Sequence, residues 1–311
     1  MKTLGAVAFA AFTTACADSV TRVATIVPLF GPAIGNEVIA GRAEDLEPRG
    51  PSLLLAGERT LVQIDLKSGT ASRHPLRIPQ QDSCWGLARL RDGSIWTIKS
   101  RSTLLRVAAD GEVIEEHALG AAHFGLFGAG DRLVYQPADF MPPSRALFAA
   151  RPPNVARTGW ADLKTRPFKL ARASVAALNV IACGAAVGEE RPCWFPDEPA
   201  LALIDPSGHT RRVPLSGLTV VPLEVLLTSD TPARPIRDAF VDVSGTIWVL
   251  SSGTPSSSDE RPGAWLLARY AGDGSPLGIS RLPEPVRLIL RAEPRRAVVI
   301  TGAGMVAEVR P

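Results

Sequence analysis

Residues 91–97 read RDGSIWT, and residues 243–249 read VSGTIWV. In both stretches a glycine stands two positions before an Ile-Trp pair, and a short run with apolar residues precedes the turn: GLARL in the first copy and DAFVD in the second. The two copies lie about 150 positions apart, and their similarity indicates an internal repeat. This repeat is the feature from which the fold can be predicted.

The region around the first copy, residues 85–119, divides into short runs that are rich in β-branched or alternating apolar residues. The runs are LARLR (87–91), SIWTIK (94–99), TLLRVA (103–108) and EVIEEHAL (112–119). The dipeptide Asp-Gly at 92–93 separates the first run from the second, and the one at 110–111 separates the third from the fourth. Asp-Gly dipeptides are typical of hairpin turns. Four antiparallel strands in about 40 residues make one blade of a β-propeller.

The same pattern recurs elsewhere along the chain. The further units are 37–76, 123–150, 178–215, 237–283 and 285–310. We therefore predict an all-β fold, a six-bladed β-propeller, although a seventh blade would fit within 138–177. The last unit supplies only three strands, so we expect the apolar N-terminal segment 19–27 to pair with the last blade and close the ring.

The tryptophans of the repeat read as core residues. The second strand of a blade is covered on both faces by the neighbouring blades, so its large side chains should fill the layers between blades. This predicts buried positions for Trp96, Trp194 and Trp248.

Composition bounds the class of protein. The chain has 311 residues, 46% hydrophobic and 21% charged, which indicates a globular domain. The net charge is only +3 and the basic residues are scattered, so we do not expect nucleic-acid binding.

The N-terminus resembles a secretory signal peptide. A basic start is followed by the apolar run LGAVAFAAF (4–12) and by small residues, and this run is too short to span a bilayer. Cleavage after Ala17 would leave a single domain, 18–311, whereas a lipobox reading of residues 13–16 would make Cys16 a lipidated first residue. We expect an exported bacterial protein that is periplasmic, secreted or lipid-anchored and has no transmembrane span.

The remaining cysteines agree with export. Cys183 and Cys193 lie ten residues apart, so they would face each other across a hairpin and form a disulfide in an oxidising compartment. Cys84 is left over, and we expect it to be a small buried hydrophobic residue.

Common catalytic motifs are absent: the sequence has no zinc-protease motif, nucleophile elbow, phosphate-binding loop or dinucleotide fingerprint. In a propeller, the residues that begin the inner strands meet at one mouth of the central channel. The residues at that register are Glu37, Cys84 or Trp85, His123, Asn179, and Asp238 with Arg237.

The segment RDAFVDVSGTIWV (237–249) resembles the repeat of six-bladed propellers in the regucalcin/gluconolactonase family and of NHL-type repeats. In the gluconolactonase family a Glu, an Asn and an Asp hold one divalent cation, and this resemblance implies Glu37, Asn179 and Asp238 as metal ligands, with Glu44 or Glu47 as alternatives to Glu37. It also implies a substrate contact at His123, and we expect Arg237, beside Asp238, to be a second substrate contact. Val180 and Ala239 stand where the family has glycine.

The implied ligands carry oxygen donors, which suit Ca²⁺ or Mg²⁺, and such a cation could polarise a lactone or ester carbonyl. The stretch WGLARLRDGSIWT (85–97) also resembles the repeat of the virginiamycin B lyase group, but Thr97-Ile98-Lys99 replaces the ending that carries a carboxylate there.

Two functions follow from this sequence. The first is an exported propeller that acts as a binding or scaffold module for a protein or small molecule, and that we expect to be a monomer. The second is a metal-dependent lactonase or esterase with its site at the channel mouth. Fold alone does not decide between them.

Overall fold

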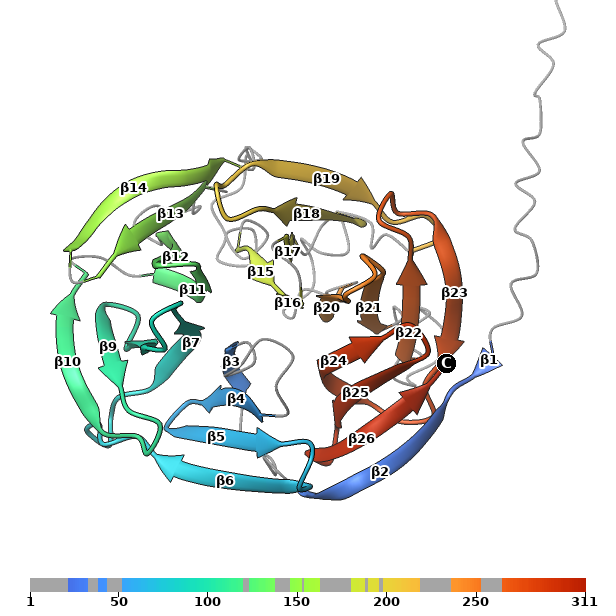
Figure 1. The fold of residues 1–311 in the computed structure, drawn as a ribbon, viewed down its shortest axis with the longest axis horizontal. Helices are drawn as coiled ribbons and strands as arrows, with labels where there is room; N and C mark the ends of the chain where they lie inside the picture. Colours follow the sequence, from blue (N-terminus) through green and yellow to red (C-terminus); the bar gives the residue numbers. More distant parts are fainter. Residues whose placement is uncertain are drawn as a thin grey trace, which may run out of the picture.

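The computed structural model of the chain describes the residues of the propeller strands and the turns between them. These residues are 22–32, 39–43, 52–119, 123–137, 146–152, 154–162, 180–187, 190–195, 198–218, 236–252 and 265–311. The strands among them form six sheets arranged in a ring (Figure 1). None of the described residues forms a helix, and so none forms one suited to crossing a membrane.

Each sheet is one blade, with its first strand at the channel and the following strands progressively farther out. Blade I contains β3 (Ile39–Ala43), β4 (Ser52–Gly57), β5 (Thr60–Asp65) and β6 (Thr70–Pro75). Blade II contains β7 (Cys84–Arg89), β8 (Ile95–Lys99), β9 (Thr103–Val107) and β10 (Val113–Ala118). Blade III contains β11 (His123–Ala129), β12 (Arg132–Pro137), β13 (Ala146–Arg151) and β14 (Asn154–Asp162).

The other blades complete the circle. Blade IV contains β15 (Ala182–Cys183), β17 (Arg191–Trp194), β18 (Ala200–Ile204) and β19 (Thr210–Pro214). Blade V contains β20 (Asp238–Val241), β21 (Ile247–Ser252), β22 (Trp265–Tyr270) and β23 (Pro276–Arg281), with β16 (Ala185–Ala186) at its inner edge and β1 (Arg22–Val23) at its outer edge. Blade VI contains β24 (Val286–Glu293), β25 (Arg296–Thr301), β26 (Met305–Arg310) and β2 (Thr25–Pro32).

The core consists of apolar layers between neighbouring blades. Strand β4 shows how the sequence builds them, because side chains alternate between the two faces of a strand. Leu53 and Leu55 pack against blade VI, whereas Leu54 and Ala56 pack against blade II. A strand that is buried on both faces therefore reads SLLLAG rather than alternating apolar and polar residues.

The three predicted core tryptophans are confirmed. Trp96 lies between blades II and III, Trp194 lies between blades IV and V, and Trp248 lies between blades V and VI. Each is at most 3% exposed. These tryptophans therefore belong to the apolar layers that pack neighbouring blades together.

The N-terminal segment joins two blades at the outer edge. Strand β2 pairs antiparallel with β26, so residues 25–32 supply the fourth strand of blade VI, where the sequence predicted 19–27. Arg22 and Val23 pair instead with β23 of blade V, parallel to it. Between the two strands Ala24 is buried in the layer between blades V and VI.

Candidate functional site

A cavity of about 290 Å³ opens where the inner strands of blades I to IV converge. Apolar residues and glycine backbone form most of its wall, with one carboxamide, one phenol and one guanidinium. The lining residues are Ile39, Gly41, Gly86, Gly125, Leu126, Phe127, Tyr135, Gln136, Leu147, Ile181, Ala182, Cys183 and Arg191. A mostly apolar cavity with a few fixed polar groups is the usual form of a small-molecule site.

The cavity follows from a break in the inner edge of blade IV. Strand β15 pairs with β17 of its own blade for only two residues, and after Gly184 the chain leaves to pair with β20 of blade V as β16. Among the described residues, the inner edge of blade IV is therefore shorter than that of its neighbours. The cavity lies between this edge and the strands of blade III.

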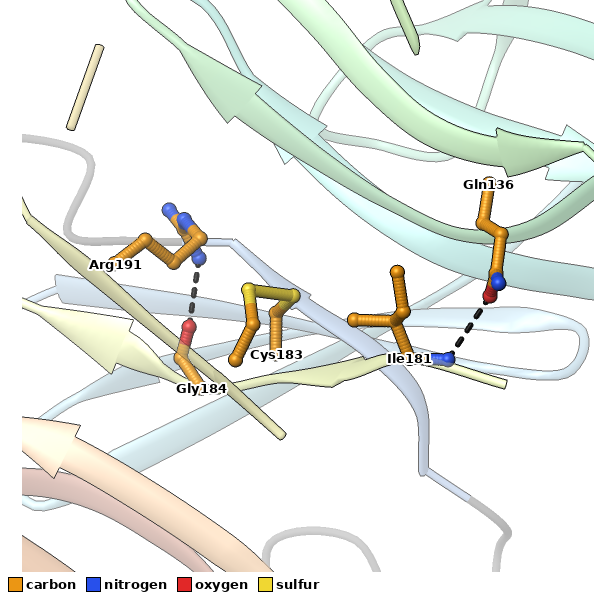
Figure 2. Close-up of a disulfide and its surroundings, with 6 residues drawn as sticks. Gln136, Ile181, Cys183, Gly184 and Arg191 are labelled. Atoms are coloured by element: carbon orange, nitrogen blue, oxygen red, sulfur yellow. Dashed lines mark hydrogen bonds between the residues drawn. A yellow bond between two sulfur atoms is a disulfide. The ribbon is translucent and has the colours of Figure 1, made fainter. Parts of the chain in front are cut away.

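Arg191 lies at this break. It begins β17, is only 9% exposed, and its Nη1 donates a hydrogen bond of 2.8 Å to the carbonyl oxygen of Gly184 (Figure 2). Its guanidinium carbon also lies 4.6 Å from the centre of the Phe127 ring, in cation–π range. The strand break and the ring of blade III thus hold a positive charge at the cavity wall.

Gln136 closes the seam between blades III and IV. Its side chain is buried, and its Oε1 accepts a hydrogen bond of 2.9 Å from the backbone N–H of Ile181 (Figure 2). This bond crosses from β12 to the start of the inner edge of blade IV. It fixes the carboxamide at the cavity.

The predicted disulfide is confirmed. Cys183 and Cys193 are bonded, and they are directly opposed in the antiparallel pair β15–β17. Cys183 lines the cavity, so the disulfide anchors the part of the wall that precedes the break at Gly184. Cys84 is a free cysteine and fully buried, as expected, and burial raises the pKa of its thiol to about 11.

The inner strands of blades I, II and III approach one another unusually closely. A Cβ added to Gly41 would lie 2.5 Å from the carbonyl carbon of Gly86, and one added to Gly86 would lie 2.6 Å from the nitrogen of Leu126. Gly86 also has a φ of +73°, which favours glycine. Backbone therefore packs on backbone along this side of the cavity.

Asp238 is the predicted metal ligand that the structure describes, and it is 3% exposed. Its Oδ1 accepts a hydrogen bond of 2.9 Å from the N–H of Ala239, and its Oδ2 accepts one of 2.7 Å from the N–H of Ile289. The carboxylate thus connects the inner strands of blades V and VI. A cation at Asp238 would have to share oxygens that backbone donors already occupy.

The other predicted site residues divide between described and undescribed parts of the chain. Arg237 is exposed, and its guanidinium carbon lies 6.0 Å from the Trp265 ring centre. His123 begins β11, but its side chain lies outside the described residues, as do Glu37 and Asn179. The predicted ligand set therefore stays a prediction, and the described residues contain no group of three His, Cys, Asp or Glu placed to hold a metal.

A second hollow of about 410 Å³ lies at the turns of blades II and III. Each of its arginines pairs with a carboxylate: Arg106 with Glu115, and Arg151 with Asp131, each at 2.6 Å. Asp92 adds a third carboxylate to the lining. Asp131 and Arg151 are more than half exposed, so this hollow is an open surface groove. The central cavity is smaller, but residues from four blades converge on it, and those from blades II, III and IV include buried ones, so we take it as the candidate site.

Sequence reasoning missed Arg191 and Gln136. The clue for Arg191 was its place in the segment RPCW, where a charged residue begins a strand that continues into core positions. Gln136 stands next to the core residues Val134 and Tyr135 in LVYQ and gives a similar clue. Neither residue begins an inner strand, and the search for site residues was confined to that register.

No protein-family model matches the chain, and no curated protein sequence matches it either. Solved structures do match. A calcium-binding protein, regucalcin, from Agrobacterium tumefaciens has a TM-score of 0.56 at 13% identity, covering 93% of this chain and 94% of that one. The match is of folds: this chain is a six-bladed β-propeller.

Two further structures have the same architecture. A gluconolactonase from Xanthomonas campestris has a TM-score of 0.53 at 15% identity, covering 92% of this chain and 89% of that one. Virginiamycin B lyase from Staphylococcus aureus has a TM-score of 0.51 at 9% identity, covering 93% of this chain and 99% of that one. At these identities the likeness concerns the fold alone.

Proposed function

We propose that this chain is an exported propeller-fold binding protein, and that its ligand site is the central cavity between the inner strands of blades I to IV. The observation that carries the proposal is the cavity itself, with buried polar groups at fixed positions in an apolar wall. Its volume of about 290 Å³ suits a small organic molecule better than a peptide or a polymer.

Export is supported by the Cys183–Cys193 disulfide, since such bonds persist in oxidising compartments. The apolar run at 4–12 and the small residues after it support removal of residues 1–17 or lipidation at Cys16. Residues 1–21 lie outside the described part of the chain. The intact mass of protein secreted by a bacterial host would distinguish cleavage after Ala17 from a lipidated Cys16.

The test of the binding site uses a matched pair of glycines. Gly125 lines the cavity, has a φ of +56°, and would meet nothing within 4 Å on gaining a Cβ. Gly130 has a φ of +65° and equal space, but it lies in the β11–β12 turn outside the cavity lining. Asn tolerates this backbone conformation best among residues with side chains, so Gly125→Asn and Gly130→Asn carry similar strain.

A library of small organic compounds is screened by thermal shift, because a ligand raises the melting temperature according to its affinity and concentration. We expect compounds that stabilise the wild type and Gly130→Asn but not Gly125→Asn. Stabilisation that survives unchanged in Gly125→Asn would place the ligand elsewhere and overturn the proposal. A screen without any stabilising compound would also count against it.

The second candidate is a divalent-metal-dependent lactonase or esterase that uses Glu37, Asn179 and Asp238, with His123 and Arg237 near the substrate. It is favoured by the fold shared with the calcium-binding regucalcin and with the gluconolactonase, and by the position of Asp238 at the start of β20. The two backbone hydrogen bonds to the Asp238 carboxylate weigh against it.

Thermal denaturation with Ca²⁺, with Mg²⁺ and with EDTA tests this candidate. A bound cation raises the melting temperature by linkage, and Asp238→Asn would reduce that rise. An unchanged melting temperature at millimolar cation would remove the metal site from consideration and leave the binding proposal intact.

A further inference from the structure

Three glycines form one side of the central cavity. Gly41, Gly86 and Gly125 come from the inner strands of blades I, II and III, and all three line the cavity. The backbone of a neighbouring blade lies against Gly41 and Gly86, whereas a Cβ added to Gly125 would meet no atom within 4 Å. The space beside Gly125 therefore belongs to the cavity.

The side chains of the wall are mostly hydrocarbon, and packing holds them in place. Phe127, Leu147 and Ile181 belong to the apolar layer between blades III and IV, and Leu126 belongs to the layer between blades II and III. Each of the four is at most 6% exposed. Because these side chains are already ordered, hydrocarbon buried against them contributes affinity in proportion to its area, without a large cost for ordering the site.

The polar side chains of the wall are engaged with the protein itself. Gln136 accepts the backbone N–H of Ile181 (Figure 2). Arg191 donates to the carbonyl oxygen of Gly184, and both polar side chains make further interactions within the protein. A charged ligand would lose its hydration on entering the cavity, and such a loss is costly when no group is available to replace it. The cavity therefore favours an uncharged ligand.

The volume of the cavity limits the size of the ligand. It measures about 290 Å³. An apolar cavity of roughly 150 Å³ is enough to hold one benzene molecule. The central cavity therefore accommodates a single ring that carries a few additional carbon atoms.

We propose that the central cavity binds compact, uncharged, hydrocarbon-rich molecules, such as a single ring with a short side chain, against Phe127, Leu147 and Ile181. This inference rests on the proposed binding function, and it adds the chemical class of the ligand. It also assigns Leu147 as a residue that limits the size of the ligand.

The first experiment varies the charge and the length of one ring compound. Toluene, benzoate and benzylamine share the ring and differ in charge, while benzene, toluene, ethylbenzene and propylbenzene differ by one carbon each. Binding to the full-length, disulfide-bonded protein is measured by titration calorimetry. We expect toluene to bind roughly tenfold or more tightly than either charged compound. Each added carbon should tighten binding by about fourfold until the cavity is full.

The second experiment enlarges the cavity. Leu147→Ala removes a leucine side chain from the wall, so the homologue that binds most tightly should become a longer one. The matched control is Leu133→Ala in the same blade, a leucine that is also buried but packs between blades II and III outside the cavity lining. It should keep the order of affinities of the wild type. If Leu147→Ala does not fold, Ile181→Val makes a smaller change of the same kind.

The outcomes separate this inference from the binding function. Benzoate or benzylamine binding more tightly than toluene, and blocked by Gly125→Asn, would overturn the preference for uncharged molecules and leave the binding site standing. Affinities that do not change with the number of carbons would overturn the role of hydrocarbon burial. The same preferred homologue in the wild type and in Leu147→Ala would overturn the role of Leu147. If no ring compound and no library compound binds in a manner sensitive to Gly125→Asn, both proposals fail.

Discussion

At the scale of single residues, the two copies of the repeat stabilise their tryptophans differently. The indole N–H of Trp248 donates to Oδ2 of Asp242 at 3.0 Å, whereas that of Trp96 donates to Oγ of Ser94 at 2.9 Å. Leu90 occupies the same position in its turn as Asp242 does in the other copy. In both turns the backbone N–H of this residue donates to the carbonyl oxygen of the residue that follows the turn glycine. The two copies therefore share the turn and the buried ring, while the acceptor of the indole N–H changes.

Asp242→Ala should destabilise the protein by roughly 2–4 kcal/mol, because it leaves the buried Trp248 N–H and the turn N–H groups without their acceptor. The matched control is Asp92→Ala, an exposed aspartate that also caps its turn, and it should cost below about 1 kcal/mol. Urea denaturation measures both. Equal losses for the two variants would refute the assigned role of Asp242.

At the scale of elements, the inner strands are joined in two ways. Where blade V meets blade VI, the carboxylate of Asp238 accepts the N–H of Ile289, and where blade III meets blade IV, Gln136 accepts the N–H of Ile181. Where blade II meets blade III, Gly86 lets the backbone of Leu126 approach directly. Asp238 and Gly86 both stand seven residues before a turn glycine, so this position of the repeat sets the spacing between neighbouring blades.

The Cys183–Cys193 bond should stabilise the fold by roughly 2–3 kcal/mol, because it closes a loop of about ten residues. The double variant Cys183→Ser/Cys193→Ser should lose this stability and bind cavity ligands more weakly, since Cys183 is part of the cavity wall. Thermal denaturation and calorimetry measure the two effects. Reductant should lower the melting temperature of the wild type but not that of the double variant, because the variant has no disulfide to reduce.

Strand β26 should contribute to acid sensitivity. Hydrogen bonds from Arg310 and Arg296 hold the pKa of the Glu308 carboxyl below its ordinary value of 4.5. A depressed pKa in the folded state stabilises the fold above about pH 4.5, and this contribution is lost as the pH falls through the folded pKa. The stability difference between wild type and Glu308→Gln should therefore shrink between pH 6 and about pH 3.

The control for this titration is Glu112→Gln, an exposed residue that pairs with Arg77 at only 4.0 Å. Exposed pairs of this kind contribute little, so its stability should follow that of the wild type throughout. A Glu308→Gln difference that stays constant with pH would mean that the carboxylate charge has no part in holding β26.

At the scale of the whole molecule, the N-terminal segment pairs with both blade V and blade VI. Ala24→Arg should cost more than about 3 kcal/mol, because it forces a charged, larger side chain into the layer where Ala24 is 3% exposed. The neighbouring Val23 is 67% exposed, so Val23→Arg should change the free energy of unfolding by less than about 0.5 kcal/mol. Similar losses in both variants would contradict the buried crossing at Ala24.

The fold was predictable from the sequence because units of short strands separated by turns recur along the chain, and the Gly-x-Ile-Trp turn marks two of these units. The buried tryptophans followed from the repeat, and the disulfide followed from the spacing of its cysteines. The candidate site was not predictable, because it depends on where a strand breaks. The sequence predicted an inner strand around LNVIACG (178–184). No residue pattern there indicates that the chain pairs with blade V after Gly184. Strand β14 was likewise missed, because it follows the end of the predicted unit 123–150.

The proposed function depends above all on the binding of a small molecule in the cavity at the inner edge of blades III and IV. The decisive measurement is a crystal structure of the protein with the compound that gives the largest thermal shift. We expect electron density for that compound between Phe127, Ile181 and Arg191. An empty cavity, with the compound bound at the rim near Asp238 or in the groove between blades II and III, would contradict the proposal.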